Sequence, residues 1–418
     1  FAELKVASSN LAGQANKYIH MSRQKSKTWC PLPWIGLSTN PDGTVMPCCL
    51  HWSSSNFWGN IKTDSYEEIM NSSKAKTMRK EMMNNIEPKG CERCYRKEEE
   101  LGESFRTILE QHHPWTSKIK NDVNDITEDD GTLKQVSAQY WDVRFSNICN
   151  MACIMCGPEF SSKWQAELKS VNGKILNNFE DKNRTYEFID NHAKNVKSIY
   201  FAGGEPLVMD EHYYILEKLI ELGRTDVNLH YNSNILKLSH KNKSASDLWK
   251  HFNRVSVAPS IDAMGPQAEY IRYGTVWNEL EKNLFELRDN PNIWVGPQIT
   301  VGVYNAIHFT KLIKFFLDNG IEDYDFNMID GNPYNMAHMP RSLKQEAHEN
   351  LVSFADSLST QHKKVFLDKS KQIIKKLTTN TIKTDQSGFV KKIKNIDQTR
   401  NLNFNKHLPE ISKHYNFN

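Results

Sequence analysis

Three cysteines on one short stretch of this 418-residue chain have a spacing that suggests chemistry. Cys149, Cys153 and Cys156 stand in the pattern CxxxCxxC within the run RFSNICNMACIMCG. Three thiolates spaced in this way can hold three irons of a [4Fe-4S] cube and leave the fourth iron open. An open metal position can take a reactive ligand, as it does at catalytic metal sites. Taken alone, the motif also fits three incidental buried thiols or a partial zinc site.

The elements around these cysteines must place them at an accessible edge of the fold. A strand is predicted from Tyr140 to Phe145, and a helix is predicted from Glu159. The cysteine loop therefore follows the C-terminal end of a strand, which is where α/β barrels build their active sites.

A second motif, Gly203-Gly204-Glu205, closes another predicted buried strand. Glycines let the backbone approach a ligand closely, and a carboxylate accepts hydrogen bonds from an ammonium group. The alternative reading of this motif is an ordinary strand-to-helix turn. The stretch between Cys156 and Gly203 is long enough for a helical crossover and a second parallel strand.

Together, the two motifs resemble those of the radical S-adenosylmethionine (SAM) superfamily. The resemblance implies that Cys149, Cys153 and Cys156 hold a [4Fe-4S] cluster whose open iron takes the amino and carboxylate groups of SAM. It implies that Gly203, Gly204 and Glu205 bind the amino group. One electron would then split SAM into methionine and a 5′-deoxyadenosyl radical, which removes a hydrogen atom from a substrate.

The same resemblance implies further cofactor contacts, all of them near predicted strand ends. Ser260 and Asp262 match a Ser-hydrophobic-Asp segment that meets the ribose, and Arg272 takes the place of an arginine that pairs with the cofactor carboxylate. A surface ion pair is the alternative for Arg272. Asn232 and Asn234 resemble a Thr-Asn-Gly segment that lines the site.

Met155 departs from the family pattern, because it stands where an aromatic residue usually packs on the adenine. A thioether can still pack on a ring. Gln298 lies on the fifth predicted strand, and the sequence does not choose between the cavity and the core for it. His338 follows the sixth predicted strand and could reach the site, but a lone histidine is more often structural.

Five more cysteines form an N-terminal group. Asn40-Pro-Asp-Gly43 predicts a hairpin that brings Cys30 and Cys48 to one end, where the knuckle of Cys91 and Cys94 can close a four-thiolate site. This group resembles a twitch domain, the shortened SPASM domain, which implies an auxiliary [4Fe-4S] cluster. The alternative is a zinc ribbon.

This module departs from the usual family order, because it precedes the predicted barrel instead of following it. Cys49 is the spare thiol beside Cys48. Three roles remain open for Cys49: it could be a ligand in place of Cys48, a hydrogen-atom donor or simply a buried thiol.

Composition limits the class of protein further. Lys and Arg number 53 against 50 Asp and Glu, so the whole-chain charge favours no particular partner. All 8 cysteines lie between Cys30 and Cys156, which favours cluster ligation in a reducing cytoplasm over a disulfide framework. No apolar run approaches the roughly 20 residues of a membrane span, and residues 1–28 lack the apolar core of a signal peptide.

From Tyr140 onward, strand and helix patterns alternate, which predicts right-handed βαβ units and a parallel sheet. Predicted strands cover 141–146, 198–202, 227–232, 254–262, 293–301 and 324–329. Predicted helices cover 159–171, 210–222, 244–252, 277–289 and 308–319. The expected fold class is α/β: a partial (β/α)6 radical SAM barrel with a small cysteine-rich α+β twitch domain and a helical C-terminal segment.

The expected domains follow from these patterns. They are an extension (1–28), a twitch-like domain (29–104), a linker (105–138), the partial barrel (139–340) and a basic helical C-terminal segment (341–418). Within the linker, a helix is expected to about His113, followed by an exposed polar loop over 118–134. The C-terminal segment could hold an acidic partner, but the spacing of Ile373, Ile374 and Leu377 favours a solvated amphipathic helix.

The sequence therefore predicts a cytoplasmic radical SAM enzyme with one auxiliary cluster. Because an auxiliary cluster can accept an electron, oxidation or cross-linking of a peptide is favoured over isomerisation. A small-molecule substrate (a sugar, nucleotide or amino acid) is the first alternative. A zinc-bound interaction or nucleic-acid-binding protein is the second. The expected partners are the substrate and an electron donor such as flavodoxin or ferredoxin, with neither a membrane nor a nucleic acid.

Overall fold

The computed structural model describes residues 28–51, 56–168, 175–179, 181–329, 331, 333–379 and 386–417. The chain folds into two compact units, each assembled from several stretches of sequence. The first unit comprises Phe1–Ile148, Lys174–Tyr231 and Ser239–Val255, and the second comprises Cys149–Gly173, Asn232–Leu238 and Ser256–Asn418. The expected extension 1–28 lies outside the described residues, except for Thr28.

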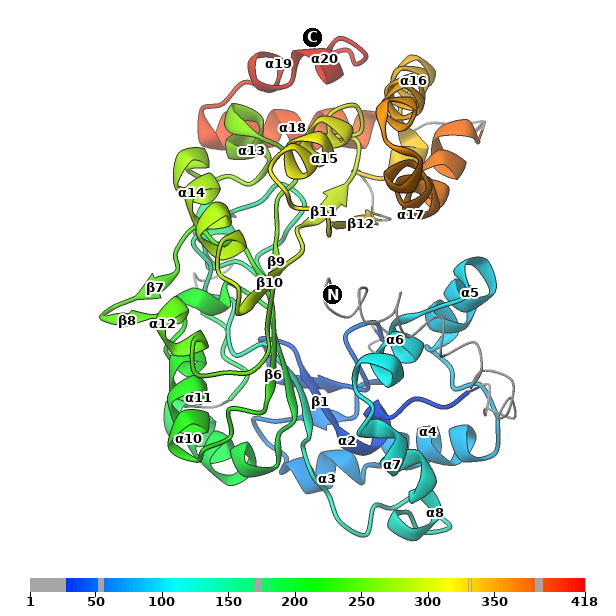
Figure 1. Ribbon diagram of the computed structural model, residues 1–418, viewed down its shortest axis with the longest axis vertical. Helices are drawn as coiled ribbons and strands as arrows, with labels where there is room; N and C mark the ends of the chain where they lie inside the picture. The colour runs from blue at the N-terminus through cyan, green and yellow to red at the C-terminus, as the bar shows by residue number, and fades with distance from the viewer. Residues whose placement is uncertain are drawn as a thin grey trace. The chain divides into compact units, whose positions relative to one another are not determined.

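A mixed sheet forms the centre of the first unit (Figure 1). Its strands follow the order β6 (Asn228–Ser233), β5 (Ser198–Phe201), β4 (Tyr140–Val143), β1 (Gly36–Thr39), β2 (Thr44–Met46) and β3 (Gly59–Asn60). β4, β5 and β6 are parallel, as the alternation of strands and helices predicts. β4 is buried along its whole length, which is typical of a central parallel strand.

The N-terminal module contributes strands to this same sheet. β1 pairs parallel with β4, with Gly36 opposite Tyr140, whereas β2 and β3 add on in antiparallel fashion. The sequence predicted a separate small domain here and not a continuation of the sheet. A strand pairing across about a hundred residues of sequence leaves no local signal in the pattern.

The predicted hairpin is confirmed between β1 and β2. The N–H of Gly43 donates to the carbonyl of Asn40 at 2.9 Å, and the N–H of Asn40 donates to the carbonyl of Thr44 at 2.9 Å. Gly43 has a φ of 88°, a conformation that L side chains rarely adopt. The glycine therefore sets the turn that brings Cys30 and Cys48 to their end of the module.

Helices surround the sheet of the first unit. They are α2 (Leu32–Ile35), α3 (Tyr66–Met70), α4 (Ser73–Met83), α5 (Glu92–Leu101), α6 (Phe105–His112), α7 (Thr116–Asn121), α8 (Val123–Ile126), α10 (Lys182–His192), η2 (Ala193–Asn195), η3 (Pro206–Val208), α11 (Asp210–Glu221) and α12 (Ala245–Trp249). A small hairpin of β7 (Ser239–His240) and β8 (Lys243–Ser244) precedes α12. The sequence did not predict α10, which Asp181 caps through the N–H of Arg184.

The expected exposed loop at 118–134 is wrong in its first half, because α7 and α8 lie there. Its second half is held by buried contacts. Arg79 donates through Nε to the carbonyl of Gly131 at 2.7 Å, and Trp34 donates through Nε1 to the hydroxyl of Thr127 at 2.9 Å. These partners lie far along the chain, so the polar composition of the stretch gave no sign of them.

The second unit holds the later strands. β9 (Val255–Pro259) neighbours β10 (Ile293–Val295), and β11 (Gln298–Val301) pairs parallel with β12 (Asp325–Met328). The predicted single strand 293–301 is therefore wrong, because it breaks at Gly296-Pro297. Proline has no N–H to donate to a ladder, so the pairing changes at this point.

The remaining elements are mostly helices. They are α9 (Ser162–Leu168), α13 (Gly265–Ile271), α14 (Trp277–Arg288), α15 (Phe309–Asp318), η4 (Met336–His338), α16 (Arg341–Ser357), α17 (Thr360–Thr378), α18 (Ser387–Arg400), α19 (Phe404–His407) and α20 (Pro409–Ser412). α13 was not predicted. The elements confirm the expected α/β class with parallel strands, and no closed barrel forms among the described strands.

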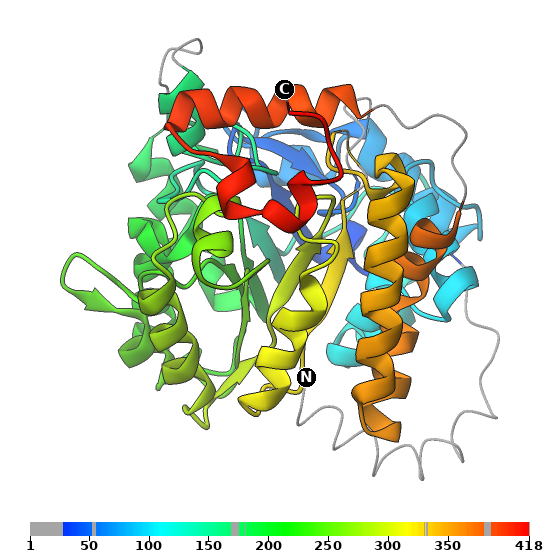
Figure 2. The same ribbon diagram turned by 90° about the horizontal axis from the view of Figure 1, so that it is seen from above.

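The C-terminal segment is helical, as predicted. α16 and α17 lie side by side (Figure 2), and the amphipathic pattern of α17 buries Ile373 and Leu377. Among the described residues, no helix has both the length and the apolar character needed to cross a bilayer.

Candidate functional site

The loop of Cys149, Cys153 and Cys156 is fixed by the backbone on one side. The N–H of Ala152 donates to the carbonyl of Tyr273 at 2.8 Å, and the N–H of Ile154 donates to the carbonyl of Ile271 at 2.9 Å. Two ladder-like bonds therefore hold the loop against the end of α13.

Side chains at the start of α9 hold the other side of the same loop. The indole Nε1 of Trp164 donates to the carbonyl of Cys153 at 2.7 Å, and the N–H of Cys149 donates to the hydroxyl of Ser162 at 3.2 Å. The loop is thus held at its first and second cysteines, although it has no regular secondary structure.

Burial dominates the electrostatics of this loop. Burial raises the pKa of Cys153, and the nearby Arg272 guanidinium opposes that rise from 3.9 Å. Burial and then the charge of Cys153 raise the pKa of Cys156 to about 12. Neighbouring buried thiolates need a cationic partner to ionise, and iron supplies one in a cluster. The donor set therefore fits the [4Fe-4S] cluster that the sequence predicts.

Arg272 and Asp262 form a buried ion pair. The Arg272 Nε lies 2.8 Å from the Asp262 Oδ2, and the Asp262 Oδ1 accepts the N–H of Thr300 at 2.6 Å. Burial raises the pKa of Asp262, and the charge of Arg272 opposes the rise. The surface ion pair considered for Arg272 is wrong, since the pair is buried. Their roles toward SAM remain predictions, and each side chain already has the other as a partner.

The backbone of this chain requires glycine at the first two positions of Gly203-Gly204-Glu205. A Cβ on Gly204 would lie 2.0 Å from the carbonyl oxygen of Ile148, and Gly203 has a φ of 113°. The N–H groups of Gly204 and Glu205 donate to the carbonyls of Ser146 and Ile148 at 3.2 and 2.8 Å. The motif therefore packs against the residues that directly precede Cys149.

Glu205 is 2% exposed, and its Oε1 accepts the N–H of Leu207 at 3.1 Å, which caps η3. This is the turn that the alternative reading of the motif expected. The carboxylate still has capacity to accept further donors. Its role toward the SAM amino group stays a prediction.

The other predicted cofactor contacts belong to the second unit. Asn234 donates through Nδ2 to the Oδ1 of Asn150 at 2.7 Å, so it contacts the cysteine loop directly. The N–H of Ser260 donates to the carbonyl of Ser233 at 2.8 Å. Four more residues are half-buried: Asn232, Met155, Gln298 and His338.

The N-terminal thiols Cys30, Cys48, Cys91 and Cys94 lie within electrostatic reach of one another. Burial raises the pKa of Cys48 first, and the charges of Cys30, Cys91 and Cys94 raise it further. Burial and then Cys94 raise the pKa of Cys91 to about 12. No disulfide joins any of the 8 cysteines.

This grouping matches the four ligands predicted for a second centre. Across the described residues, no three Cys, His, Asp or Glu side chains converge closely enough to bind a single metal ion. A cube distributes its four ligands over four irons, so convergence on one point is not what a [4Fe-4S] cluster requires.

Cys49 points away from this group. Its thiol lies near Asp142 on β4, whose charge raises the pKa of Cys49 after burial does, and the Oδ2 of Asp142 accepts the hydroxyl of Ser38 at 3.0 Å. Arg144 pairs with the same carboxylate, with Nη2 3.2 Å from Oδ1. Burial raises the pKa of Asp142, and Arg144 is the largest opposing influence.

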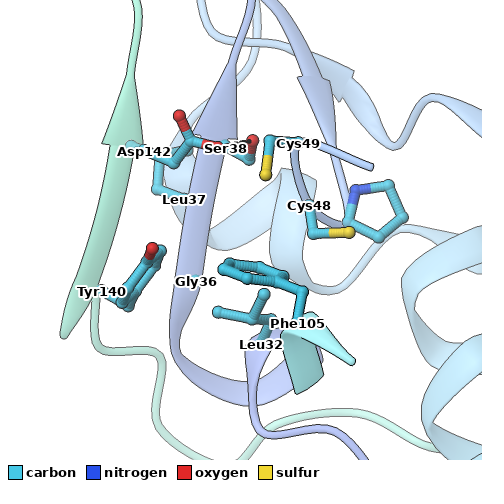
Figure 3. Close-up of a pocket in the computed structure, with 10 residues that line it drawn as sticks. Leu32, Gly36, Leu37, Ser38, Cys48, Cys49, Phe105, Tyr140 and Asp142 are labelled. Atoms are coloured by element: carbon cyan, nitrogen blue, oxygen red, sulfur yellow. Dashed lines mark hydrogen bonds between the residues drawn. The ribbon is translucent and has the colours of Figure 1, made fainter. Parts of the chain in front are cut away.

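Figure 3 shows that Cys48 and Cys49 direct their sulfur atoms to different sides of a pocket in the first unit. The pocket is lined by Leu32, Gly36, Leu37, Ser38, Pro47, Cys48, Cys49, Phe105, Tyr140 and Asp142. The sequence reasoning missed Asp142 and Arg144. The available signal was the pair of charged residues in alternate positions within the otherwise largely apolar run 140–145.

Family models match the chain in two places. Residues 30–95 match the SPASM iron–sulfur cluster-binding domain, and residues 143–315 match the radical SAM superfamily. The chain belongs to the radical SAM superfamily. The SPASM match contains all four N-terminal ligand candidates, and the radical SAM match contains the three-cysteine loop. These matches confirm the expected cofactors of a radical SAM protein with an auxiliary domain: SAM and a [4Fe-4S] cluster for each domain.

Solved structures resemble this radical SAM chain only distantly. Native anSMEcpe with bound AdoMet is 19% identical with a TM-score of 0.37, over 50% of this chain and 58% of that chain. Streptococcus suis SuiB bound to precursor peptide SuiA is 14% identical with a TM-score of 0.36, over 77% and 69%. TYW1 with a lysine-pyruvate adduct is 15% identical with a TM-score of 0.30, over 52% and 70%. The match to anSMEcpe thus spans less than two thirds of that protein, and no curated protein matches the sequence.

Proposed function

We propose that this radical SAM enzyme cleaves SAM reductively and uses the resulting radical to remove a hydrogen atom from an unactivated carbon of a peptide. Cys149, Cys153 and Cys156 would hold the catalytic cluster, and Cys30, Cys48, Cys91 and Cys94 would hold the auxiliary one. When bound, SAM and the catalytic cluster supply the 5′-deoxyadenosyl radical. The chain must bind the substrate, exclude water and accept the electron and the proton that the substrate radical loses.

The net reaction in this proposal is a two-electron oxidation. The substrate C–H gives its hydrogen atom to form 5′-deoxyadenosine, and the substrate radical then loses one electron and one proton. The electron would pass to the auxiliary cluster, and the proton would pass to the Asp142 carboxylate. The substrate therefore loses two hydrogens for each SAM consumed.

The observation that supports this proposal is the second group of thiols in the first unit, where the charges of Cys30, Cys91 and Cys94 act on Cys48. These four residues fit an auxiliary cluster that can accept an electron. Cys48 also lines a narrow gap together with the buried Asp142 and Tyr140, so a proton acceptor lies near this group of thiols. An isomerase would need neither, because it returns the hydrogen atom to its product.

A peptide is proposed over a small metabolite because of charge. Residues 341–418 carry fifteen Lys and Arg against seven Asp and Glu, an excess that favours a larger acidic substrate. A cytoplasmic location and a flavodoxin- or ferredoxin-type donor complete the proposal. Seven thiolate ligands must stay reduced, and the catalytic cluster must receive an electron for every turnover.

The experiment is an anaerobic assay of 5′-deoxyadenosine with the reconstituted enzyme, SAM and dithionite. A cell extract is separated into peptide and small-metabolite fractions, and each is tested for stimulation of product formation. We expect stimulation by the peptide fraction, and a product that lacks two hydrogens for every 5′-deoxyadenosine formed. Stimulation by the metabolite fraction alone would overturn the substrate class. An isomeric product with SAM regenerated would overturn the oxidation.

A further inference from the structure

Arg400, the last residue of α18, reaches from the C-terminal segment into the three-cysteine loop. Its side chain is 1% exposed. The Nη2 group donates to the carbonyl oxygen of Ala152 at 2.8 Å, and Ala152 directly precedes Cys153. This bond spans 248 positions of sequence, so no local pattern could predict it.

The same guanidinium makes further contacts through Nε, Nη2 and its planar face. Its Nε and Nη2 donate to the Oε2 of Glu167 on α9 at 3.0 and 2.9 Å. Its Cζ lies 4.6 Å from the ring centroid of Trp164 and 4.5 Å from that of Tyr273. A guanidinium that contacts two aromatic rings and donates two hydrogen bonds to one carboxylate has its orientation restricted, and a lysine ammonium could not reproduce this set of contacts.

Both of these rings belong to residues that bind the cysteine loop themselves. Trp164 donates to the carbonyl of Cys153, and the carbonyl of Tyr273 accepts the N–H of Ala152. Arg400 therefore contacts Ala152 and both aromatic residues that hold Ala152 and Cys153, and its charge also acts on the Cys153 thiol.

The end of α18 is itself anchored. The carboxylate of Asp397 accepts the hydroxyl of Tyr270 and the N–H of Phe404, each at 2.7 Å. Asn401 ends the helix in the left-handed conformation with a φ of 53°. Tyr270 lies on α13, whose end carries the backbone that pairs with the cysteine loop.

We infer that Arg400 is a positioning residue for the catalytic cluster, through which the C-terminal segment sets the geometry of the three-cysteine loop. This inference rests on the proposed role of Cys149, Cys153 and Cys156. It gives the C-terminal segment a function besides substrate recruitment. Groups that orient metal ligands without touching the metal typically change metal affinity or activity by about 10–100-fold when they are replaced.

The test compares Arg400→Gln with Arg400→Lys and with a matched control, Lys392→Gln. Lys392 lies on the same helix, with Nζ 4.9 Å from the ring centroid of Trp164. For each reconstituted protein, the rate at which a chelator removes iron is measured, together with the change that SAM causes in the electron paramagnetic resonance spectrum of the reduced cluster.

We expect Arg400→Gln to lose about four irons roughly 10–100-fold faster than the wild type and to show a weakened response to SAM. Arg400→Lys should lose iron at a rate between those of Arg400→Gln and the wild type. Lys392→Gln should lose iron and respond to SAM as the wild type does. The slower loss of the irons held by the N-terminal thiols reports whether each variant is folded. If Arg400→Gln folds poorly, Glu167→Gln, which leaves the guanidinium in place, should still accelerate iron loss.

Wild-type kinetics and an unchanged SAM response in both Arg400→Gln and Glu167→Gln would overturn the inference. A wild-type protein that assembles no cluster on the three-cysteine loop would instead overturn the proposed function, so the two failures are distinguishable.

Discussion

The carboxylate of Glu205 has a structural partner and a predicted ligand. Its Oε1 accepts the N–H of Leu207, and the sequence predicts that it also binds the ammonium group of SAM. Glu205→Gln separates the two roles, because the amide oxygen can still accept from Leu207 while the negative charge is lost.

We expect Glu205→Gln to bind SAM about tenfold to a hundredfold more weakly, which corresponds to roughly 1.5–3 kcal/mol for a charge-assisted bond. The iron content should not change. Equilibrium binding of SAM to the reconstituted protein measures the effect, and Glu205→Ala is the comparison that also removes the cap. Wild-type affinity in Glu205→Gln would show that the predicted contact is wrong.

Cys48 and Cys49 are adjacent in sequence but have different surroundings. The charges of Cys30, Cys91 and Cys94 act on Cys48, whereas the charge of Asp142 is the largest one that acts on Cys49. We therefore expect Cys49→Ser to keep about eight irons per chain and Cys48→Ser to keep about four. Iron and sulfide analysis after anaerobic reconstitution checks this. Loss of about four irons in Cys49→Ser alone would make Cys49 the ligand.

At the scale of single residues, the two groups of thiols could be predicted from the sequence, but their surroundings could not. Cysteine spacing is a local property, so the two groups could be read from the chain. Asp142 accepts a hydrogen bond from Ser38, which lies 104 positions away in sequence. Arg400 donates to Ala152, which lies 248 positions away. Only the folded chain brings such pairs together.

Among the elements, the strands that lead to the site were predicted more accurately than the connections between them. β4, β5 and β6 lie close to the predicted strands 141–146, 198–202 and 227–232, because β4 and β5 are largely apolar and apolar residues alternate along β6. The break at Gly296-Pro297 was missed, although proline in a strand argues for a break. α10 was missed because its eleven residues are largely polar.

The N-terminal module combines the β1–β2 hairpin with the Cys91–Cys94 pair. Whether this module holds iron or zinc can be measured directly. Replacement of both Cys91 and Cys94 by Ser should lower the iron content from about eight to about four per chain and leave zinc negligible in both proteins. Metal analysis by mass spectrometry measures both elements. About four irons with one zinc in the wild type would mean that the module is a zinc ribbon.

In the molecule as a whole, each compact unit contains one group of thiols. Cys30, Cys48, Cys91 and Cys94 lie in the first unit, and Cys149, Cys153 and Cys156 lie in the second. The units are not consecutive in sequence, since each gathers strands from several stretches. The expected domain limits at 29–104 and 139–340 therefore describe sequence segments, and as domain boundaries they remain predictions.

The central claim is that the three-cysteine loop holds the cluster that cleaves SAM. The most direct measurement is 5′-deoxyadenosine formation by the variant with Cys149, Cys153 and Cys156 all replaced by Ala, assayed anaerobically with dithionite and SAM. The Cys91→Ser/Cys94→Ser double variant serves as the control and should still cleave SAM. We predict no cleavage by the triple variant, with about four irons remaining on its N-terminal thiols. Cleavage that persists in the triple variant would contradict the account.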